Sequence, residues 1–102
     1  MKMYILVKDS VPLGNALVAV AHASLACYLD FQDHPLMKEW VVGTFYKVIC
    51  RVNDKEFARA KEFDNFLVIT ESALNDEEVA IVFAPRPDDE WPKPFKYYAL
   101  YR

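Results

Sequence analysis

The side chains that could do chemistry lie near the ends of short apolar segments and form no single motif. Lys8, Asp9 and Asn15 surround the turn after the first apolar run, and Glu71 follows a later run. His22 stands among alanines. A carboxylate can orient water or accept a proton, and an amide or ammonium group can stabilise a developing oxyanion. These residue types would support acid–base or hydrolytic chemistry if the fold brings them together at one end of a sheet.

Each of these residues also has a purely structural interpretation. His22 fits a core histidine whose ring nitrogens are hydrogen-bonded, and for a single histidine we favour this interpretation. Asp9 can bond locally within its turn, and Asn15 can cap the helix that follows. Glu71 can be a solvated loop acid, since Asp76 and two glutamates follow it. For Lys8, Asp9 and Asn15 the two interpretations are evenly balanced.

The composition narrows the function classes. The 102 residues include 12 basic and 15 acidic side chains, a net charge of −3, which disfavours a protein that binds nucleic acid through a broad basic face. No glycine-rich phosphate loop and no metal-ligand pattern is present, so we expect no cofactor and no metal. The cysteines Cys27 and Cys50 are isolated, and no signal-peptide pattern is recognised, so we expect a cytoplasmic protein. The apolar stretch 16–29 is shorter than the ~20 residues of a membrane span, so we expect no membrane association.

The apolar pattern predicts the elements that would position these residues. Strands are expected at residues 3–8, 44–52, 66–70 and 79–83. Helices are expected at residues 15–29, 35–40 and 54–63, the last capped by Asn53 and Asp54. In the first helix, Ala16, Ala19, Ala23 and Ala26 form a small-residue face that can lie close to a sheet. The order predicts one α/β domain of three layers, with a mixed four-stranded sheet, helices on both faces and an antiparallel last strand.

The C-terminal residues differ from this pattern. We expect residues 1–87 to form the α/β domain and residues 88–102 to form a proline- and aromatic-rich tail packed on it. Aromatic residues there alternate with Lys93, Lys96 and Arg102, a combination that can stack bases and hold phosphates. We favour the alternative that the tail covers a hydrophobic face or a dimer interface, so self-association is expected.

The start of the chain resembles the type II (archaeal/eukaryotic-type) peptidyl-tRNA hydrolases. In that family a strand of the form V-V-R-x-D-L leads into M-x-x-G-K-x-A-A-Q-x-x-H-A, and here a strand and a turn lead into G-N-A-L-V-A-V-A-H-A at residues 14–23. Residues 66–71 resemble the strand ending in Q-D-A-G, and residues 79–87 resemble V-L-G-I-G-P-G-P. The resemblance covers about the first 87 residues and identifies the chain as a divergent member.

The resemblance implies an enzyme that cleaves the ester between a peptide and the 3′ end of tRNA without a required metal. It places the family's histidine on His22, its glycine on Gly14, its lysine on Asn15 and its aspartate on Glu71. If hydrolysis is retained, Glu71 would orient water, Asn15 with Lys8 would stabilise the oxyanion, and His22 would support them.

The departures from the family pattern predict a degenerate catalytic site. Asn15 carries no charge, Glu71 is one methylene longer than aspartate, and residues 80–84 lack the family's glycines. The leading hypothesis is a hydrolase-like protein that hydrolyses or binds the acceptor end of peptidyl-tRNA, or binds a small ligand at the carboxyl ends of the strands. The alternative is a non-catalytic small-ligand or protein-interaction module, expected to be a homodimer.

Overall fold

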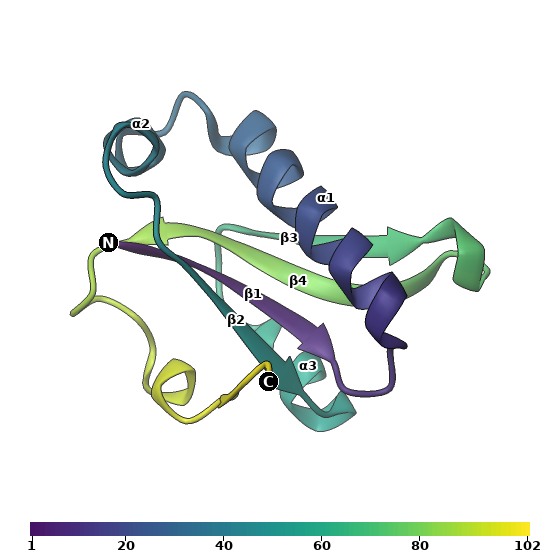
Figure 1. The fold of residues 1–102 in the computed structure, drawn as a ribbon. Helices are drawn as coiled ribbons and strands as arrows, with labels where there is room; N and C mark the ends of the chain where they lie inside the picture. Colours follow the sequence, from purple (N-terminus) through teal and green to yellow (C-terminus); the bar gives the residue numbers. More distant parts are fainter.

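A mixed sheet with strand order β3-β4-β1-β2-β5 lies between two layers (Figure 1). The structure is a computed structural model that describes residues 1–102. Its strands are β1 (Lys2–Lys8), β2 (Lys47–Val52), β3 (Phe66–Glu71), β4 (Glu77–Arg86) and β5 (Ala99–Leu100). Its α-helices are α1 (Leu13–Phe31), α2 (Pro35–Val42) and α3 (Asp54–Ala60), and its short 3₁₀ helices are η1 (Ser72–Leu74) and η2 (Lys93–Lys96). The predicted α/β class is confirmed.

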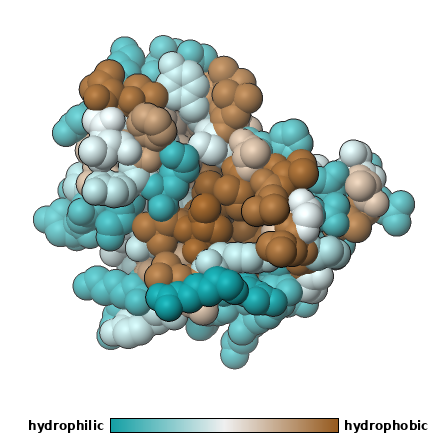
Figure 2. Space-filling view, in the orientation of Figure 1, coloured by the Kyte–Doolittle hydropathy of each residue, from teal (hydrophilic) through white to brown (hydrophobic).

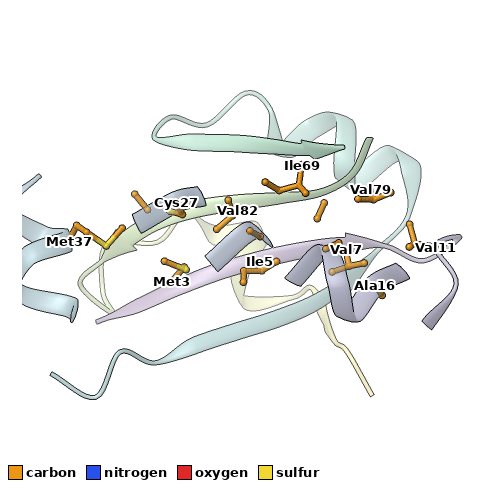
Figure 3. Close-up of a cluster of buried hydrophobic side chains, with 14 of the residues drawn as sticks. Met3, Ile5, Val7, Val11, Ala16, Cys27, Met37, Ile69, Val79 and Val82 are labelled. Carbon is orange, nitrogen blue, oxygen red and sulfur yellow. The ribbon is translucent and has the colours of Figure 1, made fainter. Parts of the chain in front are cut away.

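The central strand β1 is buried on both faces, as its continuous apolar run predicts. Met3, Ile5 and Val7 belong to the core under α1 and α2 (Figure 3). Tyr4 and Leu6 belong to a second core on the side of α3 and the C-terminal tail. Successive side chains of a strand point to opposite faces, so β1 contributes to both cores.

Helix α1 packs on the sheet through its predicted small-residue face. Ala16, Ala19 and Ala23 are buried by 98% or more, and the stripe ends at the buried Cys27. The helix begins two residues earlier than expected, at Leu13, with Pro12 at the N-cap position and no capping side chain. The prediction that Asn15 caps this helix is therefore wrong. The fixed φ of Pro12, −57°, lets the helix start directly after the proline.

The opposite face of the sheet is covered by α3 and the tail. Asn53 caps α3 as predicted, in a reciprocal pair with Glu56: the Glu56 amide donates to Asn53 Oδ1 at 2.8 Å, and the Asn53 amide donates to Glu56 Oε1 at 3.0 Å. In the tail, Trp91, Phe95 and Tyr98 are buried against the sheet. The tail thus covers a hydrophobic face, one of the two roles that the sequence left open.

The sheet has five strands rather than the predicted four. The fifth, β5, pairs antiparallel with β2 through only two residue pairs, Cys50 with Leu100 and Arg51 with Ala99. A two-residue strand leaves no alternation that a sequence pattern could reveal. The other expectations for the sheet are confirmed: β1 and β2 are parallel, and β4 is antiparallel to both β1 and β3.

Candidate functional site

The strands β1, β2 and β3 end at the same edge of the sheet. β1 and β2 are parallel, and β3 runs in the same direction because both β3 and β1 are antiparallel to β4. Lys8 and Glu71 close two of these strands, and α1 begins near the same edge (Figure 1). This is the edge at which ligands gather in open α/β sheets.

Lys8 lies on the α3 side of the sheet. It continues the alternation of Tyr4 and Leu6, and its Nζ sits 4.7 Å from the centroid of the Phe57 ring in α3. Helix α1 covers the other face, where Met3, Ile5 and Val7 point. The sheet therefore separates the Lys8 ammonium group from the start of α1.

Asn15 lies in the uncapped first turn of α1. The first helical hydrogen bond is from the Ala16 amide to the Pro12 carbonyl, at 2.9 Å, so the amides of Leu13, Gly14 and Asn15 find no backbone acceptor. A Cβ placed on Gly14 would have no atom within 4 Å. Packing therefore does not require glycine at this position. Asn15 offers a neutral amide and exposed N–H groups, but the first turn of α1 carries no cationic side chain.

His22 is exposed on the outward side of α1, in line with Val18, Leu25 and Leu29. The structure therefore does not place it in the core. At 1.5 Å per residue, it is also about 10 Å along the helix axis from Asn15. A side chain there faces solvent rather than the sheet edge.

Glu71 is engaged by the loop that follows it. Its Oε1 accepts a hydrogen bond from the Ala73 amide at 3.1 Å, which caps η1, and its carbonyl accepts from the Asp76 amide at 3.0 Å. The β3–β4 connection then passes through Asn75 and Asp76, both with positive φ. The carboxylate has a local structural role as the cap of a tight connection.

The electrostatics of this edge are mainly acidic. The acidic residues that end or follow these strands or begin β4 are Asp9, Asp54, Glu71, Asp76, Glu77 and Glu78, and the basic ones are Lys8 and Lys55. Lys61 is paired with Glu78 at 2.5 Å. Acidic side chains here would repel the phosphates of an RNA end.

None of the four sequence-predicted site residues lines a cavity. The structure contains five hollows, and Lys8, Asn15, His22 and Glu71 contribute to none of them. The largest, about 620 Å³, lies between α1, the end of α2 and β2. No group of three or more His, Cys, Asp or Glu side chains is arranged to hold a metal ion.

Neither this groove nor the exposed apolar side of α1 beside it was predicted from the sequence. The available signal was that α1 is apolar nearly all round, not on one stripe. Leu13–Phe31 is long and apolar enough to cross a bilayer by length and composition alone, a test that core helices of water-soluble proteins also pass. In this fold the alanine side is covered by the sheet and the leucine side is left exposed.

The fold is that of an open α/β sandwich with an alanine-lined first helix and a polar sheet edge. The profile of the peptidyl-tRNA hydrolase PTH2 family matches residues 1–100, nearly the whole chain and well into the tail. The chain therefore belongs to the type II peptidyl-tRNA hydrolase family. No curated protein matches it at a significant level.

Proposed function

We propose that this family member has lost ester hydrolysis and uses the hydrolase fold as a non-catalytic binding module. One observation carries the proposal: the groups that would form the catalytic site are dispersed. Lys8 lies across the sheet from α1, His22 faces solvent, and Glu71 caps η1.

The chemistry of ester cleavage explains why this dispersal matters. Hydrolysis needs an oriented water and a preorganised group that stabilises the oxyanion. Asn15 is neutral, and the nearest strand-end cation, Lys8, is on the other face of the sheet. A misplacement of ~1 Å in a catalytic group can cost on the order of a hundredfold in rate. The Lys8 ammonium group instead lies against the Phe57 ring, on the face of the sheet opposite α1.

The charge distribution also disfavours tRNA as the ligand. Binding to a nucleic-acid backbone depends on Lys and Arg contacts with phosphates. Here the net charge is −3, and the sheet edge is mainly acidic. We also propose a reducing, cytoplasmic setting, since Cys27 and Cys50 are free, buried thiols in separate cores on opposite faces of the sheet.

The decisive experiment measures release of the acyl group from N-acetyl-aminoacyl-tRNA by the purified chain. An active type II hydrolase serves as the positive control. We expect release no faster than spontaneous hydrolysis, because no oxyanion-stabilising cation accompanies Glu71.

The Glu71→Gln variant tests whether any release of the acyl group depends on the Glu71 carboxylate. Glutamine keeps an oxygen that can accept the Ala73 amide hydrogen bond, but it removes the carboxylate. The fold should survive, and the release rate should stay at the spontaneous value. Release by the wild-type chain above background would overturn the proposal, and its loss in Glu71→Gln would then identify the carboxylate as catalytic.

A further inference from the structure

The sheet ends on one side in a strand edge that has no neighbour. β3 is the terminal strand in the order β3-β4-β1-β2-β5, and its ladder is with β4 alone (Figure 1). It spans six residues, Phe66–Glu71. A free strand edge presents a row of unpaired backbone N–H and C=O groups, which can pair with another extended chain.

The hydrogen-bond pattern shows which backbone groups of β3 are free. The Ala84 amide donates to the Asn65 carbonyl at 2.9 Å, and these two residues are opposite each other in the register of β3 and β4. In an antiparallel pair every second residue bonds to the partner strand. Leu67 therefore bonds to β4, whereas the N–H and C=O groups of Phe66 and Val68 point away from the sheet.

β3 lacks the usual protection of an edge strand. Proteins normally guard such edges with charged side chains, proline, a bulge or a very short strand. Residues 66–70 read F-L-V-I-T, with no charge and no proline, and most of these residue types favour strands. The one irregularity of the β3–β4 register falls between Ile69 and Thr70. Residues 66–69 therefore form a regular, unguarded edge.

The opposite edge of the sheet is protected. Its last strand, β5, has only two residues. In the neighbouring β2, Arg51 is exposed, with its guanidinium carbon 5.5 Å from the centroid of the Tyr101 ring. Figure 2 views the molecule from the β2 side and shows strongly hydrophilic residues below the central hydrophobic ones. The contrast leaves the β3 edge as the one that is open to pairing.

We propose that the β3 edge binds an extended segment of a partner protein, which adds a sixth strand antiparallel to β3. Main-chain hydrogen bonds along an open edge select an extended peptide backbone, because only such a backbone repeats donors and acceptors at the spacing of a strand. Antiparallel pairing is the more stable of the two arrangements. This inference goes beyond the proposed function and holds whether or not hydrolysis is retained.

The side chains along the edge indicate the composition of the bound segment. Phe66 and Val68 are half-buried on the α3 side of the sheet, and Leu67 is half-buried on the α1 side. A sixth strand would cover the exposed parts of these side chains through cross-strand pairs. Its central residues should therefore be apolar or β-branched.

The charges place basic residues at one end of the segment. Glu71, Asp76 and Glu77 lie at the carboxyl end of β3, and residues 66–85 contain no Lys or Arg. At the start of β3, by contrast, Asp64 is already paired with Arg86 at 2.7 Å. In an antiparallel arrangement the amino-terminal residues of the bound segment lie beside the carboxyl end of β3. The segment should therefore begin with Lys or Arg.

The test uses the heptapeptide K-K-T-V-T-V-T, acetylated and amidated at its ends, with amide hydrogen exchange of the full chain measured by NMR. In the free protein the Phe66 and Val68 amides should exchange rapidly, because no acceptor protects them. At peptide concentrations up to on the order of 1 mM, exchange at these two amides should slow by at least about tenfold. Absence of this protection would overturn the proposal.

Two control peptides separate strand pairing from other modes of binding. Methylation of every valine and threonine amide nitrogen keeps the side chains and the charge but removes the donors, so this peptide should give no protection. Equal protection by it would overturn the proposal. The peptide E-E-T-V-T-V-T should bind at least about tenfold more weakly, because like charges meet at the carboxyl end of β3. Equal affinity would overturn the assignment of a basic end.

Val68→Pro tests the same edge from the protein side. Proline is tolerated at an edge position whose N–H faces solvent, so the chain should fold, and circular dichroism checks this. The peptide affinity should fall at least about tenfold. Val68→Thr is the matched control, since threonine keeps both the N–H and the β-branched shape, and it should bind as the wild type does. Equal affinities of the proline and threonine variants would overturn the proposal.

Two further outcomes are decided on the wild-type chain. If Val68→Pro does not fold, the methylated peptide by itself decides whether backbone donors are required. Protection of the Phe66 and Val68 amides that rises with protein concentration in the absence of peptide would assign the β3 edge to pairing between copies of the chain. That result would overturn the proposal of a partner segment.

Discussion

Lys8 and Glu71 end strands that run in the same direction, yet their side chains interact with different parts of the fold. The Lys8 ammonium group lies over the Phe57 ring, and the Glu71 carboxylate caps η1. Each side chain therefore already has an interaction within the fold, a cation–π contact for Lys8 and a hydrogen bond for Glu71. In an active hydrolase these groups would have to be held ready for substrate, and that difference is the residue-level argument for a degenerate site.

The two cysteines allow a test of side-chain burial at the level of single residues. Burial raises the pKa of Cys27 from its ordinary value of 9.0 to about 12, and Asp30 adds to the shift. Burial, with a smaller effect of Glu56, raises the pKa of Cys50 from 9.0 to about 11. Because the thiolate is the reactive form, neither thiol should be alkylated by iodoacetamide in the folded protein at pH 8. Both should react in denaturant, and mass spectrometry checks the difference.

These pKa shifts also predict how stability depends on pH. The folded protein keeps its thiol protons at pH values where the unfolded chain has released them. The free energy of unfolding should therefore fall as the pH rises from about 9 toward 12. In the alkylation experiment, modification of either thiol in the native protein at pH 8 would contradict the buried environments of Cys27 and Cys50.

At the scale of the elements, α1 and α3 begin in different ways. Helix α1 starts after a proline with no capping side chain, whereas α3 has a complete capping box. A helix of seven residues is marginal by itself, so α3 depends on its cap and on the packing of Phe57 and Ala60. Loss of its N-terminal cap should therefore lower the stability of the protein.

Asn53→Ala should destabilise the protein by about 1 kcal/mol, because the Glu56 amide loses its side-chain acceptor. Asn53→Asp is the matched control, since aspartate keeps an acceptor oxygen and places a negative charge near a helix N-terminus. Urea unfolding followed by circular dichroism gives both values. Equal midpoints for the alanine and wild-type chains would show that the cap contributes nothing.

Across the whole molecule, the two faces of the sheet are covered differently. Long helix α1 covers one face with small residues, while short α3 and the irregular tail cover the other with large aromatic ones. Phe95 lies at the centre of the aromatic group, 5.0 Å from Phe83, 5.1 Å from Tyr4 and 4.9 Å from Trp91 between ring centroids. The tail is thus part of the core, and the family profile accordingly extends to residue 100.

Phe95→Ala should therefore destabilise the protein by about 3–5 kcal/mol, the range for removing a buried aromatic side chain. Tyr97→Ala, two residues away and 73% exposed, should change stability by less than about 0.5 kcal/mol. Chemical denaturation of the two variants tests the contrast. A Phe95→Ala chain as stable as the wild type would mean that the tail is not packed on the sheet in solution.

The sequence by itself determined the order of the three α-helices and of strands β1 to β4, the alanine face of α1, the cap of α3 and the family. These features depend on local propensity, on alternation along a strand and on residues close together in the chain. They could be predicted because each is encoded within a short segment.

Only the tertiary structure decided which of these residues meet and which surfaces stay open. The β1 ladder places Lys8 on the α3 face, β5 forms from two residues of the tail, and His22 turns to solvent. The exposed leucine side of α1 follows from the sheet covering only the alanine side. Each outcome depends on contacts between segments far apart in the chain, so no local pattern could have settled it.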